Sequence, residues 1–378
     1  MIYLDNAASS HPKPSSVYEA ADRTLRLGAN PGRSGHGAAL AAARQVLEAR
    51  ESVARLLGVG DASRVVFTLN GTHALNLALK GVLRPGDHAV TTRMEHNSVV
   101  RPLAALEGRG VSVTWVEAGR DGVVSVAALE RALRPETRVI ALCHASNVSG
   151  TLQDAAAVGD LCRRRGLLFL LDAAQTVGSL PLDVSALGVH LLAAPGHKGL
   201  LGPQGTGLLY VAPGVEVQPL LEGGTGSRSE DRSMPEEMPE ALEAGTLNAS
   251  GLAGLGAGAA YLQERGVASV RRGEEGILEY LLPELTAVPG LVLYGPREVS
   301  RRVAVVSFNL AGRDAAHVGF ALDELYGIAV RVGLHCAPDA HKTLGSFPAG
   351  SVRASFGAFN AVEDAEGLVR ALRELAAL

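Results

Sequence analysis

Cysteine and lysine are scarce in this chain. Among its 378 residues there are three cysteines, Cys143, Cys162 and Cys336, and no two of them have C-x-x-C spacing. Their odd number and spacing argue against a disulfide scaffold or a cysteine-rich zinc site, and favour a reducing cytoplasm as the compartment. Lysine occurs only at positions 13, 80, 198 and 342. Chemistry that needs a primary amine therefore has very few candidates.

Long apolar runs and an excess of basic side chains are also missing. The mean hydropathy is +0.16, and no run is long enough to span a bilayer, which argues against a membrane protein. The first residues lack the basic region and apolar core of a signal peptide. Lys and Arg number 35 against 39 Asp and Glu, a net charge of −4, which argues against a general nucleic-acid-binding protein. The length predicts roughly two or three domains.

Short apolar runs alternate with helical patterns through the middle of the chain. Several of the runs are continuous in Val, Leu and Ile, which is typical of strands covered on both faces. The predicted strands are residues 64–69, 88–92, 111–117, 139–144, 167–172, 190–194 and 207–211. The alternation predicts an α/β fold with a mostly parallel, seven-stranded sheet.

The pattern changes after about residue 213. A polar stretch, residues 223–240, is predicted to be a long loop, and residues 250–265 a helix rich in Ala and Gly. Strands and helices beyond residue 284 indicate a smaller α+β domain. We expect a segment of residues 1–15 that packs on the small domain, a large domain of residues 16–250 and a small domain of residues 251–378.

The glycines at 254, 256 and 258 superficially resemble a dinucleotide-binding loop. They do not match G-x-G-x-x-G, and they fall inside a helical pattern instead of following a strand. We therefore interpret them as small residues that allow close helix packing. A nicotinamide-dependent dehydrogenase is disfavoured for the same reason.

Candidate site residues follow the ends of the predicted strands, where active sites lie in doubly wound sheets. Gly71 and Thr72 open a helix, whose N-terminus suits a phosphate group. His96 can stack on a planar ring or transfer protons. Asp172 directly follows an apolar strand, where a carboxylate stays ionised only beside a positive partner such as a protonated pyridine nitrogen. Taken singly, each also fits an ordinary capping or surface role.

Lys198 lies just beyond another strand, in Gly196-His197-Lys198-Gly199. A desolvated lysine near other cations loses its proton and can form a Schiff base, although a phosphate-binding or solvated lysine is the alternative. A phosphate cradle, a stacking histidine, a pyridinium partner and a Schiff-base lysine, in this order, are what pyridoxal phosphate needs. A non-catalytic subunit that keeps the fold remains an alternative of a different class.

Cys336 differs from the other two cysteines because it lies in a Gly/Pro loop near Arg331 and His335. Such surroundings favour a reactive thiolate. A metal site of His335, Cys336 and His341 matches no common zinc spacing, and we expect no metal. Arg353, in a strand before an aromatic residue, suits a bidentate grip on a substrate carboxylate, with a surface salt bridge as the alternative.

At this point the motifs resemble those of cysteine desulfurases of the class-V aminotransferase family, over essentially the whole chain. The subgroup that they resemble is the selenocysteine-lyase-like one, with a short Arg-x-Gly-x-His-Cys-Ala loop. The motifs are Tyr3-Leu4-Asp5-Asn6-Ala7-Ala8, Met94-Glu95-His96, Ser146-Asn147-Val148-Ser149-Gly150-Thr151, Asp172-Ala173-Ala174-Gln175, Gly196-His197-Lys198, Glu243-Ala244-Gly245-Thr246 and Arg331 to Ala337.

The resemblance implies a fold-type I enzyme in which Lys198 holds pyridoxal 5'-phosphate as a Schiff base. Asp172 would pair with the pyridine nitrogen, Gln175 would reach the ring oxygen, and His96 would stack on the ring. The phosphate would be held by Gly71, Thr72 and His197, with Thr246 donated by a second subunit.

The resemblance also implies a reaction. Asn147, beside the cofactor, and Arg353 would grip the carboxylate of L-cysteine or L-selenocysteine. Cys336 would take the sulfur as a persulfide and leave L-alanine. The implied partners are a second copy of the chain, with shared active sites, and a sulfur-acceptor protein, for example in iron–sulfur cluster assembly. The alternatives are a selenocysteine lyase, and a transaminase or epimerase in which Cys336 has no catalytic role.

Three positions depart from the family pattern. Pro195 stands where relatives usually have Ser or Thr, and the stretch from Asn70 to His73 carries one hydroxyl where relatives often have two. Both changes imply a weaker hold on the phosphate. Leu334 replaces a common second histidine beside the cysteine, which leaves Cys336 without that activating group.

Overall fold

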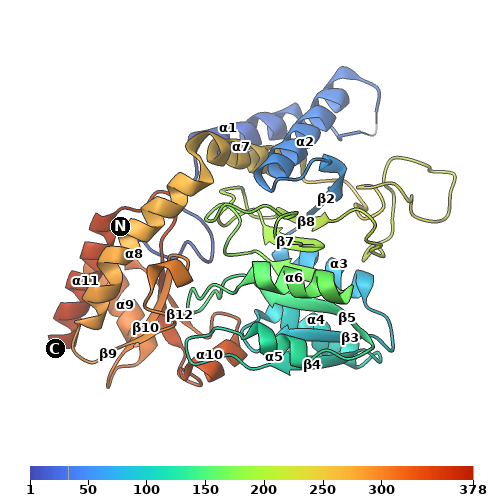
Figure 1. The fold of residues 1–378 in the computed structure, drawn as a ribbon. Coiled ribbons are helices and arrows are strands. Elements are labelled where there is room, and N and C mark those ends of the chain that lie inside the picture. Colours follow the sequence, from blue (N-terminus) through green and yellow to red (C-terminus); the bar gives the residue numbers. More distant parts are fainter. Residues whose placement is uncertain (33, 378) are drawn as a thin grey trace.

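The computed structural model describes residues 1–32 and 34–377, and it contains two main sheets (Figure 1). The larger sheet has seven strands in the order β2-β8-β7-β6-β5-β3-β4, and only β8 runs antiparallel to its neighbours. Its strands are β2 (Val65–Thr68), β3 (His88–Thr92), β4 (Ser112–Val116), β5 (Thr137–Cys143), β6 (Leu168–Asp172), β7 (Leu191–Pro195) and β8 (Gly207–Val211). The predicted α/β class with a mostly parallel, seven-stranded sheet is confirmed.

Both faces of this sheet are covered, as the continuous apolar runs predicted. Alternate residues of one strand enter different cores: Ile140 packs with the helices on one face, and Ala141 with those on the other. On the first face lie α2 (Gly37–Leu56), α5 (Val126–Arg131), α6 (Ala155–Arg165) and α7 (Ala249–Arg265). On the second lie α3 (Gly71–Val82) and α4 (Asn97–Glu107).

The smaller sheet has the order β12-β13-β10-β9 and is antiparallel. Its strands are β9 (Leu291–Tyr294), β10 (Val305–Leu310), β12 (Arg331–Gly333) and β13 (Ser351–Ser355). The long helix α8 (Val267–Thr286), α9 (Ala315–Tyr326) and α11 (Val362–Ala377) pack beside it in a separate core, at the left of Figure 1. The short helix α10 (Pro338–Leu344) packs instead against the core of the large sheet.

The N-terminal segment joins the smaller sheet. β1 (Ile2–Tyr3) pairs in parallel with β11 (Ile328–Ala329), Asp5 bridges to Ser355, and Leu4 enters the core of the smaller sheet. Residues 328–333 form two short strands and not one, because β11 pairs with β1 whereas β12 pairs with β13. Helix α1 (Ser15–Leu27), which follows the N-terminal segment, was not predicted, and neither was α8.

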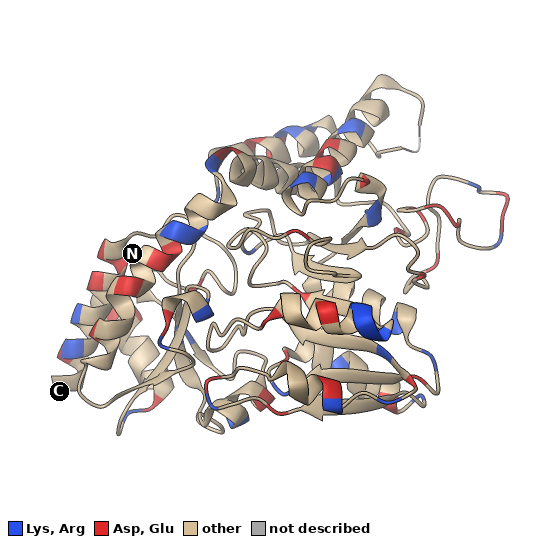
Figure 2. Ribbon diagram, viewed as in Figure 1, with Lys and Arg blue, Asp and Glu red and all other residues tan. Residues whose placement is uncertain are grey.

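The glycine-rich stretch is helical and tightly packed, as predicted. A Cβ atom added at Gly256 would lie 2.7 Å from the Cα of Ala49 on α2, closer than real Cβ contacts come. The expected loop of residues 223–240 is also confirmed, within a stretch from 212 to 248 that has neither helix nor strand. Acidic and basic side chains are mixed along the outer helices (Figure 2). Within the described residues, no helix is long and apolar enough to cross a membrane.

Candidate active site

A cavity of about 220 Å³ opens at the carboxyl ends of the parallel strands. It brings together eight of the residues predicted from sequence. They are Gly71, Thr72, His96, Asn147, Asp172, Gln175, His197 and Lys198. Cys143, Pro195 and Ser98 also line it, whereas Thr246, Cys336 and Arg353 do not.

Asp172 ends β6 and lies beside Cys143 of β5 in the sheet. Burial raises the pKa of its carboxyl group. The hydrogen bond from the Ala174 N–H, 3.0 Å from Oδ1, and the charge of Lys198 lower the pKa, but they only partly cancel the effect of burial. The carboxylate therefore needs a further positive partner to stay ionised.

Lys198 lies in the turn after β7. Burial lowers the pKa of its amine to about 8, against the opposing effect of Asp172. The turn is very tight, since a Cβ atom on Gly199 would lie 2.3 Å from the carbonyl oxygen of Val177. A lysine with this pKa is partly neutral near pH 7 and can act as a nucleophile.

The start of α3 forms one end of the cavity. Asn70 caps the helix by accepting a hydrogen bond from the N–H of His73 at 2.9 Å. A Cβ atom on Gly71 would lie 3.2 Å from Cδ of Pro195, so glycine lets the helix terminus and β7 approach closely. Thr72 Oγ1 lies 2.7 Å from Ser98 Oγ. The N-terminus of this helix and two hydroxyls thus face an anion-sized end of the cavity.

Ser98 was missed in the sequence. It supplies a second hydroxyl near Thr72, whose hydroxyl is the only one in the Asn70–His73 stretch. Pro195, which also lines the cavity, has none. Its position two residues after His96, at the start of a helix, was the available signal. Its contact with Thr72 of another helix could not be inferred from spacing.

His96 caps α4 and is held in one tautomer. Its Nδ1 accepts a hydrogen bond from the Ser98 N–H at 3.0 Å, which leaves the proton of the neutral ring on Nε2. Burial lowers its pKa to about 4, and the nearby charge of Lys198 adds to the effect. The ring is therefore neutral at pH 7 and carries one transferable proton.

The N-terminal segment covers the other end of the cavity. Gln175 Nε2 donates to the carbonyl of Ala7 at 3.1 Å, and the carbonyl of His197 accepts from the N–H of Ser10 at 2.9 Å. Nδ1 of His197 is buried and, among the described residues, has no hydrogen-bond partner. A ligand oxygen in the cavity would supply that partner.

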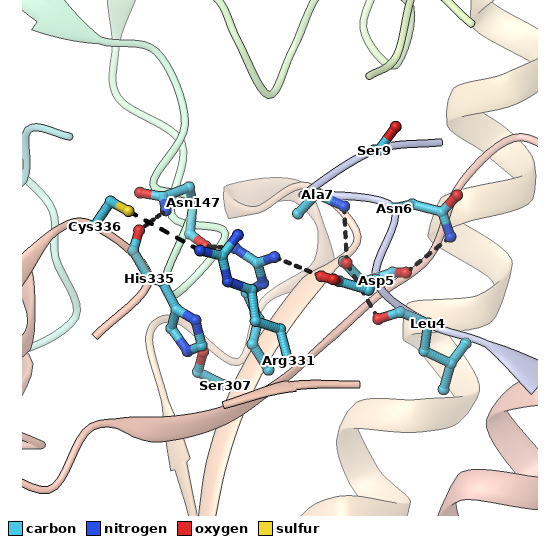
Figure 3. Close-up of polar contacts among 12 residues, drawn as sticks. Leu4, Asp5, Asn6, Ala7, Ser9, Asn147, Ser307, Arg331, His335 and Cys336 are labelled. Atoms are coloured by element: carbon cyan, nitrogen blue, oxygen red, sulfur yellow. Dashed lines mark hydrogen bonds and ion pairs between the residues drawn. The ribbon is translucent and has the colours of Figure 1, made fainter. Parts of the chain in front are cut away.

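Cys336 lies in the loop between β12 and α10 and is exposed, whereas the other two cysteines are buried. Cys336 and His335 both have left-handed backbone, with φ of 58° and 47°. Their carbonyls accept hydrogen bonds from the Asn97 N–H at 2.8 Å and Asn147 Nδ2 at 2.7 Å. These two bonds tie the loop to the wall of the cavity. Figure 3 shows the Cys336 sulfur beside Arg331, whose Nη2 is 4.0 Å away.

Arg353 lies on β13 and is almost completely buried. Its Nη2 donates to Asp5 Oδ1 at 2.7 Å, and its Nη1 to the carbonyl of Asn147 at 3.1 Å. Nε is buried and has no partner among the described residues. Burial lowers the pKa of the guanidinium, and Asp5 opposes this. The surface salt bridge weighed as an alternative is wrong for Arg353, and its pairing with Asp5 was missed.

Thr246 lies outside the cavity of its own chain. It is exposed and lines a different cavity of about 140 Å³ with Leu220, Asn248 and other residues. The described residues contain no group of three or more His, Cys, Asp or Glu side chains arranged to hold a metal ion.

Comparison with known proteins identifies the family: residues 2–368 match the family described as Aminotransferase class-V, and the chain belongs to it. A probable cysteine desulfurase of Methanothermobacter thermautotrophicus is 38% identical, over 100% of this chain and 95% of that protein. A cysteine desulfurase of Escherichia coli is 34% identical, over 99% and 93%. The apo structure of a cysteine desulfurase from Thermococcus onnurineus superposes with a TM-score of 0.92 at 32% identity, covering 100% and 94%. The family resemblance of the motifs is confirmed.

Members of this family use pyridoxal phosphate, and the residues of the cavity fit that group. An amine, a buried carboxylate that needs a positive partner, and a helix N-terminus with two hydroxyls surround one cavity. The buried Nδ1 of His197, which has no hydrogen-bond partner among residues 1–32 and 34–377, adds a polar atom that a ligand could pair with. The amine matches the aldehyde of the cofactor, the carboxylate matches its pyridine nitrogen, and the helix N-terminus with its two hydroxyls matches its phosphate.

Proposed function

We propose that this protein is a pyridoxal-phosphate-dependent cysteine desulfurase, which converts L-cysteine to L-alanine and keeps the sulfur as a persulfide on Cys336. One observation carries the proposal. The loop that exposes the Cys336 thiol is held by Asn97 and Asn147 at the edge of a cavity that contains Lys198 and Asp172.

The predicted residues would hold the cofactor in the following way. Lys198 would bind its aldehyde, Asp172 its ring nitrogen and Gln175 its ring oxygen, while His96 would lie against the ring. Gly71, Thr72 and His197 would hold the phosphate, together with Thr246 of a second subunit. When bound, the cofactor withdraws electrons from the α-carbon of an attached amino acid and so loosens a sulfur on the β-carbon.

The residues of the chain then have separate tasks. Asp172 keeps a negative charge beside the ring nitrogen, and His96 holds a proton at Nε2. Lys198, with a pKa lowered to about 8 by burial, exchanges protons near neutral pH. The guanidinium of Arg353 and the amide of Asn147 bind the substrate carboxylate.

Cys336 removes the sulfur. Its thiolate attacks the substrate sulfur, so that an S–S bond forms as the C–S bond breaks. The electron pair of the broken bond stays with the carbon fragment, which takes up a proton and leaves as alanine. Arg331 Nη2 lies 4.0 Å from the sulfur.

A homodimer with shared sites belongs to the same proposal. It is supported by the exposure of Thr246 and its distance from the cavity of its own chain. The division into residues 1–15, 16–250 and 251–378, a cytoplasmic location and a sulfur-acceptor protein are further parts of the proposal.

The test compares wild-type enzyme with Cys336→Ala and Cys162→Ala on L-cysteine, with alanine and sulfide as readouts. Cys162 is buried, so its variant controls for the loss of a thiol as such. We expect Cys336→Ala to lose at least about 100-fold in turnover and Cys162→Ala to remain active. Unchanged turnover in Cys336→Ala would remove the proposed nucleophile.

The same variants separate the alternatives. If the wild-type enzyme turns over L-selenocysteine far faster than L-cysteine, and Cys336→Ala keeps the activity on L-selenocysteine, the enzyme is a selenocysteine lyase, because selenide leaves more readily than sulfide and the thiol is then dispensable. A keto acid or a D-amino acid as product would indicate a transaminase or an epimerase. An absorbance spectrum before and after borohydride shows whether the cofactor is bound to a lysine; a protein without the band would be a non-catalytic subunit.

A further inference from the structure

A second, smaller cavity lies behind Lys198. Its volume is about 40 Å³, and its walls come from the N-terminal segment, the turns after β6 and β7, α8 and the smaller sheet. Lys198 and Gln175 line both this cavity and the one at the strand ends. One water molecule needs roughly 10–15 Å³ of such space, so the cavity admits about three or four.

Glu274 of α8 points a carboxyl oxygen into this buried region. The residue is 3% exposed, and its Oε1 accepts a hydrogen bond from Ser179 Oγ at 3.1 Å. Its Oε2 has no hydrogen-bond partner among the described residues. Buried polar atoms in native proteins are almost always paired, and water in an adjoining polar cavity is the ordinary partner.

The charged residues near Glu274 do not supply a hydrogen-bond partner for its Oε2. Arg271, one turn earlier on α8, donates instead to the carbonyls of Arg302 and Val299 and pairs with Glu275. Arg265 acts on Glu274 only through its charge. Among the described residues that line the cavity, Lys198 and Glu274 are the only ones with titratable side chains.

Burial shifts the proton affinities of the two groups towards each other. It raises the pKa of Glu274 to about 8, against the opposing effects of Ser179 and Arg271. It lowers the pKa of Lys198 to about 8. Burial therefore favours proton exchange between the carboxyl group and a free amine.

We propose that the small cavity holds a short chain of water molecules that carries protons between Glu274 and the Lys198 amine, which makes Glu274 a positioning residue for the lysine. The carboxylic acid gives a proton to the first water, and the last water gives one to the free amine. A carboxylate and an ammonium group result, and the reverse transfer restores both neutral groups. This inference rests on the proposed role of Lys198, but not on Cys336 or on the identity of the substrate.

The first test is a crystal structure of the full-length holoenzyme at a resolution that shows ordered water. We expect water within hydrogen-bond distance of Glu274 Oε2 and further water leading to Lys198. A dry cavity would overturn the proposal. This test needs no variant and so does not depend on how a substitution folds.

The second test measures the pKa of the Lys198 amine in the full chain freed of cofactor. The rate at which acetic anhydride labels Lys198 is followed against pH by mass spectrometry, in wild type, Glu274→Gln and Glu275→Gln. Glu275 is the neighbouring carboxylate on the same helix and does not line the cavity. The other charged groups near Lys198, unchanged in every variant, are Asp172, Arg331, Arg353 and Cys336.

We expect the pKa of Lys198 to shift in Glu274→Gln, because the group that exchanges protons with it through water is lost, and to stay unchanged in Glu275→Gln. Equal pKa values in the two variants would contradict the proposal. The solvent deuterium isotope effect on turnover of the holoenzyme should also change in Glu274→Gln alone. Failure of the Cys336 test would leave both readouts intact, so the two proposals can fail separately.

Discussion

Asp5 Oδ1 and Arg353 Nη2, which are 348 positions apart in the chain, form a 2.7 Å ion pair. The Arg353 side chain is 1% exposed and that of Asp5 24%. The pair fastens the N-terminal segment to β13 and orients the guanidinium that the proposed function assigns to the substrate carboxylate.

Asp5→Asn should destabilise the fold by about 1–3 kcal/mol, because it leaves a buried guanidinium without its charge partner. The measurement is the free energy of unfolding from urea titration. Asp22→Asn breaks the exposed pair with Arg26 and is the matched control, expected within about 0.5 kcal/mol of wild type. Similar losses of unfolding free energy in both variants would mean that the burial of Arg353 does not strengthen its pair with Asp5.

Arg353→Lys should lower kcat/KM for L-cysteine by about 10- to 100-fold, mainly through KM, because an ammonium group cannot make the bidentate contact. Steady-state kinetics separate the two constants. If kcat falls while KM stays the same, Arg353 serves the architecture of the loop and does not bind the carboxylate.

A thiol titration of the native protein should find one fast-reacting cysteine in each chain. Burial raises the pKa of Cys162 to about 12, so only about one molecule in 10,000 carries the thiolate at pH 8. Burial also raises the pKa of Cys143 well above its ordinary value. Cys336→Ala should abolish the fast reaction, and a second fast thiol would show that one of the buried sites opens.

Glu95→Gln should become more stable than wild type as the pH rises. Burial raises the pKa of Glu95 to about 8 from 4.5, so its contribution to stability is full below pH 4.5 and is lost as the pH rises towards 8. Glutamine does not titrate. The difference in unfolding free energy should therefore move in favour of the variant by about 2–4 kcal/mol between pH 5 and pH 9.

The control for this pH series is Glu117→Gln, at a side chain that is 77% exposed. Its stability relative to wild type should stay nearly constant over the same range. A pH-independent difference for Glu95→Gln would mean that Glu95 is ionised in the folded protein at pH 5.

Gly256→Ala should cost about 1–3 kcal/mol, because the new Cβ would meet Ala49 of α2 at 2.7 Å. Gly273→Ala on α8, where a Cβ meets nothing within 4 Å, should instead stabilise by about 0.5–1 kcal/mol. Urea titrations of both variants give opposite signs if helix packing decides the outcome. The same sign of the change in both variants would show that helix propensity alone decides the outcome.

The sequence allowed prediction of the residues that follow strands. Asp172 and Lys198 stand directly after apolar runs, and parallel strands bring such positions to one edge of the sheet. Contacts between residues that are distant in the sequence could not be predicted. The pairs Asp5 with Arg353 and Ser98 with Thr72 share no periodic pattern and no motif. Glu274 was hidden for a related reason: α8 was not predicted, so nothing indicated that this carboxylate is buried.

The hydrogen bonds from Asn97 and Asn147 to the Cys336 loop run to its backbone carbonyls. At these two points the loop is held by its backbone, in which His335 and Cys336 adopt strained left-handed conformations, while the buried His335 ring adds a contact with Ser351 Oγ at 3.2 Å. Exchange of Leu334 for another residue should then retune the chemical surroundings of the sulfur while leaving its location unaltered. A scaffold of this kind lets reactivity drift during evolution without the enzyme having to rebuild the place where it happens.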